Sequence, residues 1–136
     1  MRAVLDVNVI VSGVLSRSGA PAQVLRSWLD GDFEMVVSPA LLDELARVLR
    51  YPKIRNRISE EDAESLVELI SAGAILADDP GTPETALSSD PDDEYLVSLA
   101  RVTRSVLVTG DADLLGLAAR MPVVAPRAFL DMLVDG

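Results

Sequence analysis

The sequence contains no histidine and no cysteine. These two absences remove most of the side chains that enzymes use as nucleophiles, bases or soft metal ligands. A Ser-His-Asp triad, a cysteine nucleophile, paired-histidine cleavage of RNA and a zinc site built on thiolate or imidazole are all excluded. Disulfide bonds are excluded as well, so nothing indicates a secreted fold held by covalent bridges. Any chemistry has to use carboxylates, hydroxyls, amides, arginine or the single lysine.

Long apolar runs are also missing, although 49% of the 136 residues are hydrophobic. A membrane-spanning helix needs about 20 consecutive apolar residues, and the apolar stretches here are far shorter. The apolar N-terminal segment carries Asp6 and Asn8 in its middle, which is not typical of a signal peptide. We therefore expect a soluble cytoplasmic protein with no membrane partner, folded as one domain over residues 1–136.

Positive charge is scarce, because 12 basic residues stand against 22 acidic ones and the formal net charge is −10. Residues 1–57 carry a net charge of +2 and residues 58–136 carry −12. Such a chain binds nucleic acid poorly by charge alone. A metal ion or a small basic patch would therefore have to provide the attraction for the phosphate groups. A solvated helix face is the alternative interpretation of that patch. The candidate RNA contacts in it are Arg47, Arg50, Lys53, Arg55 and Arg57.

Short β-type runs alternate with helical periods along the chain. Strands are predicted at residues 3–5, 33–37, 74–77, 106–108 and 123–124. Helices are predicted at residues 21–29, 39–50, 59–73 and 90–104, from Asp113, and after Pro126. The proline-rich stretch 78–91 is predicted as a loop. Strands separated by helices indicate an α/β fold of three layers, with a central, mainly parallel sheet covered on both faces.

Acidic residues gather at the strand ends and helix starts of this pattern, and ligand sites form at the carboxyl ends of parallel strands. Asp6 ends the first strand between Leu5 and Val7, where an unpaired carboxylate is costly, so a functional role is favoured for it. Glu44 borders the buried stripe of its predicted helix, whereas Asp43 faces away from the stripe. The gathered acids are Asp6, Glu44, Asp90, Asp92, Asp93, Asp111 and Asp113.

Helix geometry does not decide for every one of these acids whether it is a site residue or a helix cap. Asp92 and Asp93 both border the buried side of their helix, and geometry does not separate them. Asp90 stands before Pro91 and is most simply an N-cap, with Asp93 completing a capping box. Asp113 is either a helix cap or a site residue.

Carboxylates gathered without lysine or histidine beside them repel one another and resist ionisation. A divalent cation resolves this repulsion, and oxygen ligands alone suit Mg²⁺ or Mn²⁺. One or two such ions activate water and stabilise the charge that develops on a phosphodiester during in-line attack. Metal-assisted phosphodiester hydrolysis is therefore the chemistry that this composition supports best.

Four blocks of the sequence follow one another over nearly the whole chain. They read Leu5-Asp6-Val7-Asn8-Val9, then Val37-Ser38-Pro39 leading to Glu44-Leu45, then Asp90-Pro91-Asp92-Asp93-Glu94-Tyr95-Leu96 running into Leu99-Ala100, and finally Leu107-Val108-Thr109-Gly110-Asp111-Ala112-Asp113-Leu114-Leu115. In this order and spacing the chain resembles the PIN-domain family. The sequence of the last two blocks is most similar to that of the bacterial VapC-like subgroup, the toxins of toxin–antitoxin systems.

The resemblance implies an endoribonuclease that hydrolyses single-stranded RNA with one or two Mg²⁺ or Mn²⁺ ions. It also implies a homodimer and an antitoxin protein as partner. The family's catalytic, metal-binding acids would fall on Asp6, Glu44, Asp93 and Asp111, with Asp113 as an accessory ligand. Asp93 is preferred over Asp92 because it stands seven residues before Ala100, as the family's helix acid does. The supporting residues would be Asn8, Thr109 and Asp92.

Other enzyme classes fit the pattern less well. A receiver-type phospho-acceptor domain needs a lysine after a late strand, but the single lysine is Lys53. A haloacid-dehalogenase-type phosphatase needs a second aspartate where Asn8 stands, and no G-x-x-x-x-G-K phosphate loop occurs. The alternative that remains is a metal-binding PIN fold that acts by binding RNA or a protein partner without significant cleavage.

Overall fold

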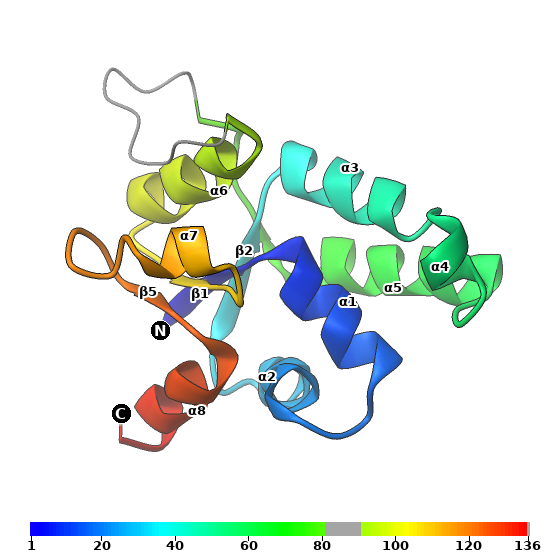
Figure 1. The fold of residues 1–136 in the computed structure, drawn as a ribbon, viewed down its shortest axis with the longest axis horizontal. Helices are drawn as coiled ribbons and strands as arrows, with labels where there is room; N and C mark the ends of the chain where they lie inside the picture. Colours follow the sequence, from blue (N-terminus) through cyan, green and yellow to red (C-terminus); the bar gives the residue numbers. More distant parts are fainter. Residues whose placement is uncertain (81–90, 136) are drawn as a thin grey trace.

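The strands form a single sheet, and helices lie on both sides of it (Figure 1). The computed structural model describes residues 1–80 and 91–135. Within this part, five strands pair in the order β3-β2-β1-β4-β5, and every pairing is parallel. The predicted α/β fold with a central parallel sheet is confirmed. The strands are β1 (Arg2–Leu5), β2 (Glu34–Val37), β3 (Ile75–Leu76), β4 (Val106–Val108) and β5 (Val123–Val124).

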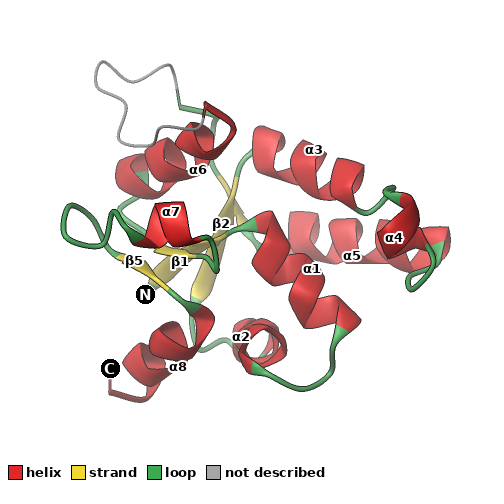
Figure 2. Ribbon diagram, viewed as in Figure 1, coloured by secondary structure: helices red, strands yellow, loops and turns green. Residues whose placement is uncertain are grey.

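The helices connect the strands and cover the sheet (Figure 2). Helix α6 packs against β1 and β4, while α2 packs against both α1 and α8. In Figure 1, α6 and α7 lie above β1 and β5, and α2 and α8 lie below them. In the described ranges the helices are α1 (Val7–Leu15), α2 (Ala20–Leu29), α3 (Pro39–Val48), α4 (Pro52–Arg55), α5 (Glu60–Gly73), α6 (Pro91–Val102), α7 (Ala112–Leu115) and α8 (Pro126–Asp135).

The central strand β1 and its neighbour β4 end at the same edge of the sheet. Ala3, Val4 and Leu5 are completely buried, as expected for a strand with a neighbour on each side and helices on each face. Leu5 is in register with Val108 of β4. The next residue on each strand therefore leaves the sheet at the same edge, and the backbone N–H of Asp6 donates to the carbonyl oxygen of Val108 at 2.9 Å.

Two helices were not assigned from sequence. The segment of α1 is almost wholly apolar, so it shows no clear buried stripe, and its residues Val7, Val9, Ile10 and Val11 are all buried. Helix α4 is a single turn of four residues, too short for a period to be visible. In the described ranges, no helix combines the length and apolarity that crossing a bilayer requires.

A glycine sets how closely α1 and α2 approach. A Cβ on Gly13 would lie 2.6 Å from Leu25 Cδ1 and 2.8 Å from the carbonyl oxygen of Pro21. A larger residue at this position would push the two helices apart. Gly13 thus keeps the beginning of α2 close against α1, beside the edge of the sheet that carries the acidic residues.

Candidate active site

Buried polar side chains mark the carboxyl edge of the sheet. Asp6 follows β1 and is 6% exposed, while Ser38 after β2 and Thr109 after β4 are 0% exposed. Polar groups are rarely buried without hydrogen-bond partners, because desolvation has to be compensated. Each of these three side chains has such a partner. The parallel topology therefore brings a connected polar edge together from residues more than 100 positions apart.

Thr109 joins two of the predicted acids. Its hydroxyl donates to Asp6 Oδ2 at 2.7 Å and accepts from the backbone N–H of Asp111 at 3.0 Å. Asp6 Oδ1 accepts from the backbone N–H of Asn8 at 3.2 Å, so Asp6 also caps α1. A carboxylate offers about four lone-pair sites. Asp6 is thus fixed through both oxygens and retains acceptor capacity toward the edge of the sheet.

Asp111 caps the short helix α7. Its Oδ1 accepts from the backbone N–H of Asp113 at 2.8 Å, and α7 begins at Ala112. The interpretation of Asp113 as the cap, with the helix starting there, is wrong, because the first-turn donors of α7 point at the preceding aspartate. Asp113 is exposed in the first turn. Asp111 is half-buried, so the acid that closes the Thr109 chain is the less mobile of the two.

Glu44 is held by an arginine one turn further along α3. The guanidinium of Arg47 forms an ion pair with Glu44 Oε2 and donates from Nη1 to the hydroxyl of Tyr51 at 2.8 Å. The Arg47 guanidinium also lies 5.9 Å from the centre of the Tyr51 ring. Glu44 is half-buried, so this pair orients the glutamate at the end of α3 that faces the carboxyl edge.

Tyr95 on α6 reports which acids share one neighbourhood. Burial, and then the negative charges of Glu44, Asp6 and Asp93, raise the pKa of the Tyr95 phenol above its usual value of 10.0. Arg47 acts in the opposite direction. Three predicted site acids, from α3, the end of β1 and α6, therefore lie near enough to one phenol to influence its charge, and Asp93 is half-buried.

Tyr95 is the site residue that the sequence analysis did not identify. The two tyrosines are most simply packing residues, and Tyr95 does pack against the core, but the negative charges of the acids also act on its phenol. Its place two residues after Asp93 in the third sequence block is the signal that could have indicated it. Asp90 and the side chain of Asp92 lie outside the described residues, so the cap predicted for Asp90 does too.

The donor chemistry of this edge fits a hard divalent cation, because the available ligands are carboxylate and hydroxyl oxygens. The distances between the acidic side chains fit such an ion less well. Among the residues that the structure describes, no three acidic side chains come close enough to form a ready metal-binding group. Part of the reason is visible at Glu44, whose carboxylate is occupied by Arg47.

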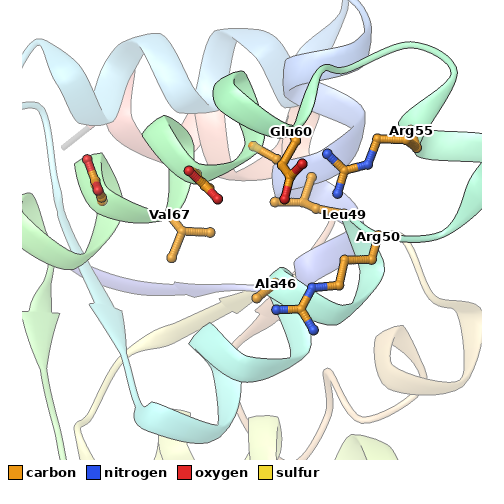
Figure 3. A pocket seen from close by; sticks show the side chains of 9 residues that line it. Ala46, Leu49, Arg50, Arg55, Glu60 and Val67 are labelled. Carbon is orange, nitrogen blue, oxygen red and sulfur yellow. The ribbon is translucent and has the colours of Figure 1, made fainter.

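The basic residues predicted to contact RNA have different neighbours in the structure. Arg47 faces the acids, and Arg57 Nη2 donates to the carbonyl oxygen of Leu15 at 2.9 Å. Arg50 and Arg55 line a cavity of about 280 Å³ between α3, α4 and α5 (Figure 3). The α5 side of that cavity carries Glu60, Glu64 and Glu68. These three acidic residues would repel a phosphate backbone at that place.

A comparison with known families identifies the class of protein. A family model described as PIN domain matches residues 2–113, which is most of the chain. The chain therefore belongs to the PIN-domain family, and the resemblance of the four sequence blocks is confirmed.

Individual relatives agree with this assignment. The uncharacterized protein MJ1680 of Methanocaldococcus jannaschii is 26% identical over 119 residues, covering 86% of this chain and 75% of that protein. The crystal structure of PAE2754 from Pyrobaculum aerophilum matches with a TM-score of 0.67 at 14% identity, covering 100% of this chain and 91% of that one. VapBC2 from Rickettsia felis, bound to a DNA fragment from its promoter, matches with a TM-score of 0.61 at 16% identity, covering 91% and 97%. At these identities the solved structures establish a shared fold.

Proposed function

We propose that this protein is an endoribonuclease that hydrolyses phosphodiester bonds of single-stranded RNA with the help of Mg²⁺ or Mn²⁺. PIN domains are generally nucleases, so membership in the family supports a hydrolase. The observation that carries the proposal is the buried hydrogen-bonded chain from Asp6 through Thr109 to Asp111. Glu44 and Asp93 act on the same phenol as Asp6, which adds two more acids to this edge.

The proposed roles are those that the family resemblance implies for these residues. Asp6, Glu44, Asp93 and Asp111 would hold one or two ions, with Asp113 as an accessory ligand. A bound ion supplies a polarised water and stabilises the charge that develops on the phosphate. Thr109 fixes Asp6 Oδ2, and the Asn8 backbone fixes Oδ1. Asp92 would support the site beside Asp93. Glu44 would exchange its contact with Arg47 for a ligand role.

The biological role that we propose is that of the toxin in a toxin–antitoxin pair. The shared fold with VapBC2 of Rickettsia felis supports this role. An antitoxin protein would then be a partner, the chain would act as a homodimer in the cytoplasm, and residues 1–136 would form one domain. Gel filtration with light scattering tests the dimer directly.

One observation favours a second candidate function. The described residues contain no ready group of three acids, which is what a PIN fold acting by binding RNA or a protein partner, without significant cleavage, would show. The assay that separates the two functions measures cleavage and RNA binding on the same preparation. Binding with no cleavage in millimolar Mn²⁺ would establish the second function.

The substitution Asp6→Asn tests the proposed mechanism. It keeps the volume of the side chain but removes the carboxylate that Thr109 and Asn8 orient, so Mn²⁺-dependent cleavage of defined single-stranded RNAs should fall to the level seen in EDTA. Circular dichroism should show an intact fold. Asp131→Asn on the exposed face of α8 is the matched control and should cleave like the unmodified protein. Full activity in Asp6→Asn would exclude the mechanism.

A further inference from the structure

A second cavity adjoins the acidic edge on the side of α1. Its volume is about 310 Å³, at the lower end of the roughly 300–1,000 Å³ that small-molecule sites occupy. It is lined by residues of α1, of the start of α2, of the turn after β4 and of the start of α8. We call it the α1 pocket and define it by Asn8, Ser12, Pro21, Gly110, Asp111 and Pro126.

The α1 pocket is continuous with the candidate active site. Asp111 lines the pocket and is also the end of the hydrogen-bonded chain that begins at Asp6. Asn8 lines it as well, and the backbone N–H of Asn8 donates to Asp6 Oδ1. A group bound in this pocket would therefore sit directly beside a phosphate positioned at the acids.

The lining of the α1 pocket suits a neutral, flat and polar group. Asn8 and Ser12 lie one turn apart on α1, and both are exposed. In the described part of the chain, neither the Asn8 amide nor the Ser12 hydroxyl has a hydrogen-bond partner, so both can serve a ligand. Pro21 and Pro126 contribute apolar surface. The carboxylate of Asp111 disfavours a phosphate inside the pocket.

A positive charge stands outside the lining of the pocket. Arg127 follows Pro126, and its Nη1 donates to Gln23 Oε1 at 3.4 Å, two residues after Pro21 on α2. Arg127 is exposed, and no carboxylate in the described ranges lies within ion-pair distance of it. This arrangement matches a nucleotide, which combines a neutral base with a charged backbone.

We propose that the α1 pocket receives the base of one nucleotide of single-stranded RNA next to the scissile phosphate. Asn8 and Ser12 would hydrogen-bond the edge of this base and create a base preference at that position, while Arg127 would contact the backbone. This inference rests on the proposed ribonuclease function and deepens it, because it locates the residues that determine where the RNA is cut.

Gly110→Leu is the sharpest test, because a Cβ on Gly110 would meet no atom within 4 Å. Gly110 also lines the pocket, so we expect the leucine side chain to occupy part of it at little cost to the fold. Cleavage of a short RNA pool with randomised sequence should show a base preference at one position beside the cut in the unmodified protein. Gly110→Leu should remove that preference and raise KM by about tenfold. Ala118→Leu adds a similar side chain at an exposed residue outside the pocket and is the matched control.

Two further variants separate base recognition from backbone contact. Ser12→Ala should weaken the base preference and leave the salt dependence of binding unchanged. Arg127→Gln should weaken binding of all sequences alike and reduce the salt slope by about one. Binding is measured by fluorescence anisotropy of labelled RNA in the Asp6→Asn background, which keeps the RNA intact.

The outcomes distinguish this inference from the function on which it rests. If the unmodified protein cleaves RNA, and Gly110→Leu cleaves it with the same KM and the same base preference, the pocket assignment is overturned. The proposed ribonuclease function is unaffected by that result. Uniform cleavage of all sequences by the unmodified protein would overturn it as well. Absence of cleavage by the unmodified protein in Mn²⁺ would overturn the proposed function itself.

Discussion

Thr109 shows how one hydroxyl can connect two acidic residues at the carboxyl edge of the sheet. It is completely buried, it donates to Asp6 and it accepts from the backbone of Asp111. A buried hydroxyl with both a donor and an acceptor role has a single preferred orientation, so the two acids keep a defined relation to each other. The ion pair of Glu44 and Arg47 is different. The side chains are 31% and 61% exposed, so solvent screens the pair and it contributes little to stability.

Thr109→Val should therefore affect both stability and activity. Valine keeps the shape of the side chain but leaves Asp6 Oδ2 and the Asp111 N–H without this partner, which should cost about 1–3 kcal/mol in the free energy of unfolding. RNA cleavage should fall as well, because Asp6 loses one of its two anchors. Urea unfolding and steady-state kinetics measure the two effects. Thr109→Ser keeps the hydroxyl and should retain more activity than Thr109→Val, and the reverse order would contradict this role.

At the level of secondary structure, the positions of the acidic residues depend on the caps of three helices. Asp6 caps α1, Asp111 caps α7, and Ser38 caps α3 by accepting from the backbone N–H of Leu41 at 3.3 Å. The N-terminus of α3 also receives Asp79, whose carboxylate accepts from the N–H of Ala40 at 3.1 Å. Because α3 carries Glu44, its starting point determines how far that glutamate reaches along the edge.

Ser38→Ala tests this link between a cap and the site. It should destabilise the protein by about 1 kcal/mol, the usual cost of losing a serine cap, and should lower cleavage because the first turn of α3 loosens. Ser59→Ala removes the equivalent cap of α5, where Ser59 Oγ accepts from the N–H of Asp62 at 3.1 Å. That variant is the matched control, with a similar loss in urea unfolding and unchanged cleavage. Equal activity in the two variants would show that the α3 cap has no special role.

For the molecule as a whole, the net charge of −10 and the acidic edge have to be considered together. A net negative charge repels nucleic acid at long range, so the RNA recognition that we propose has to depend on local features. A cation at the acids would reverse the local sign there, and the α1 pocket with Arg127 lies beside that place. The acidic residues on the exposed side of α5, such as Glu61 and Glu64, are solvated and take no part in this edge.

Metal binding should be visible as thermal stabilisation of the whole fold. A ligand that binds only the folded state at a concentration 100 times its Kd stabilises by about 2.7 kcal/mol, so millimolar Mn²⁺ or Mg²⁺ should raise Tm by several degrees. EDTA should reverse the increase, and Asp6→Asn should not show it. A sodium chloride series at matched ionic strength controls for general screening of the net charge. The same increase in Asp6→Asn would argue against a metal site at Asp6.

Much of the fold was predictable because its signals are local. The runs 106–108 and 123–124 became β4 and β5 as predicted, and the Ser38-Pro39 and Ser59 starts became the caps of α3 and α5. Helix α1 could not be predicted, because its segment is mostly apolar and its two polar side chains, Asn8 and Ser12, are too few to show a helical period. The cap of α7 is Asp111 and not Asp113, and a local pattern does not show at which of two nearby aspartates so short a helix begins.

The amino-acid sequence by itself determined the chemistry that this protein can use. With no histidine or cysteine and an excess of carboxylates in four ordered blocks, it limited the site to oxygen ligands and indicated the PIN-domain family. Only the tertiary structure decided which of these side chains meet. The register of β1 with β4 placed Thr109 against Asp6, and Arg47 formed an ion pair with Glu44. The α1 pocket formed from segments that are distant in sequence. Such contacts depend on the pairing of strands and the packing of helices, and no local pattern encodes them.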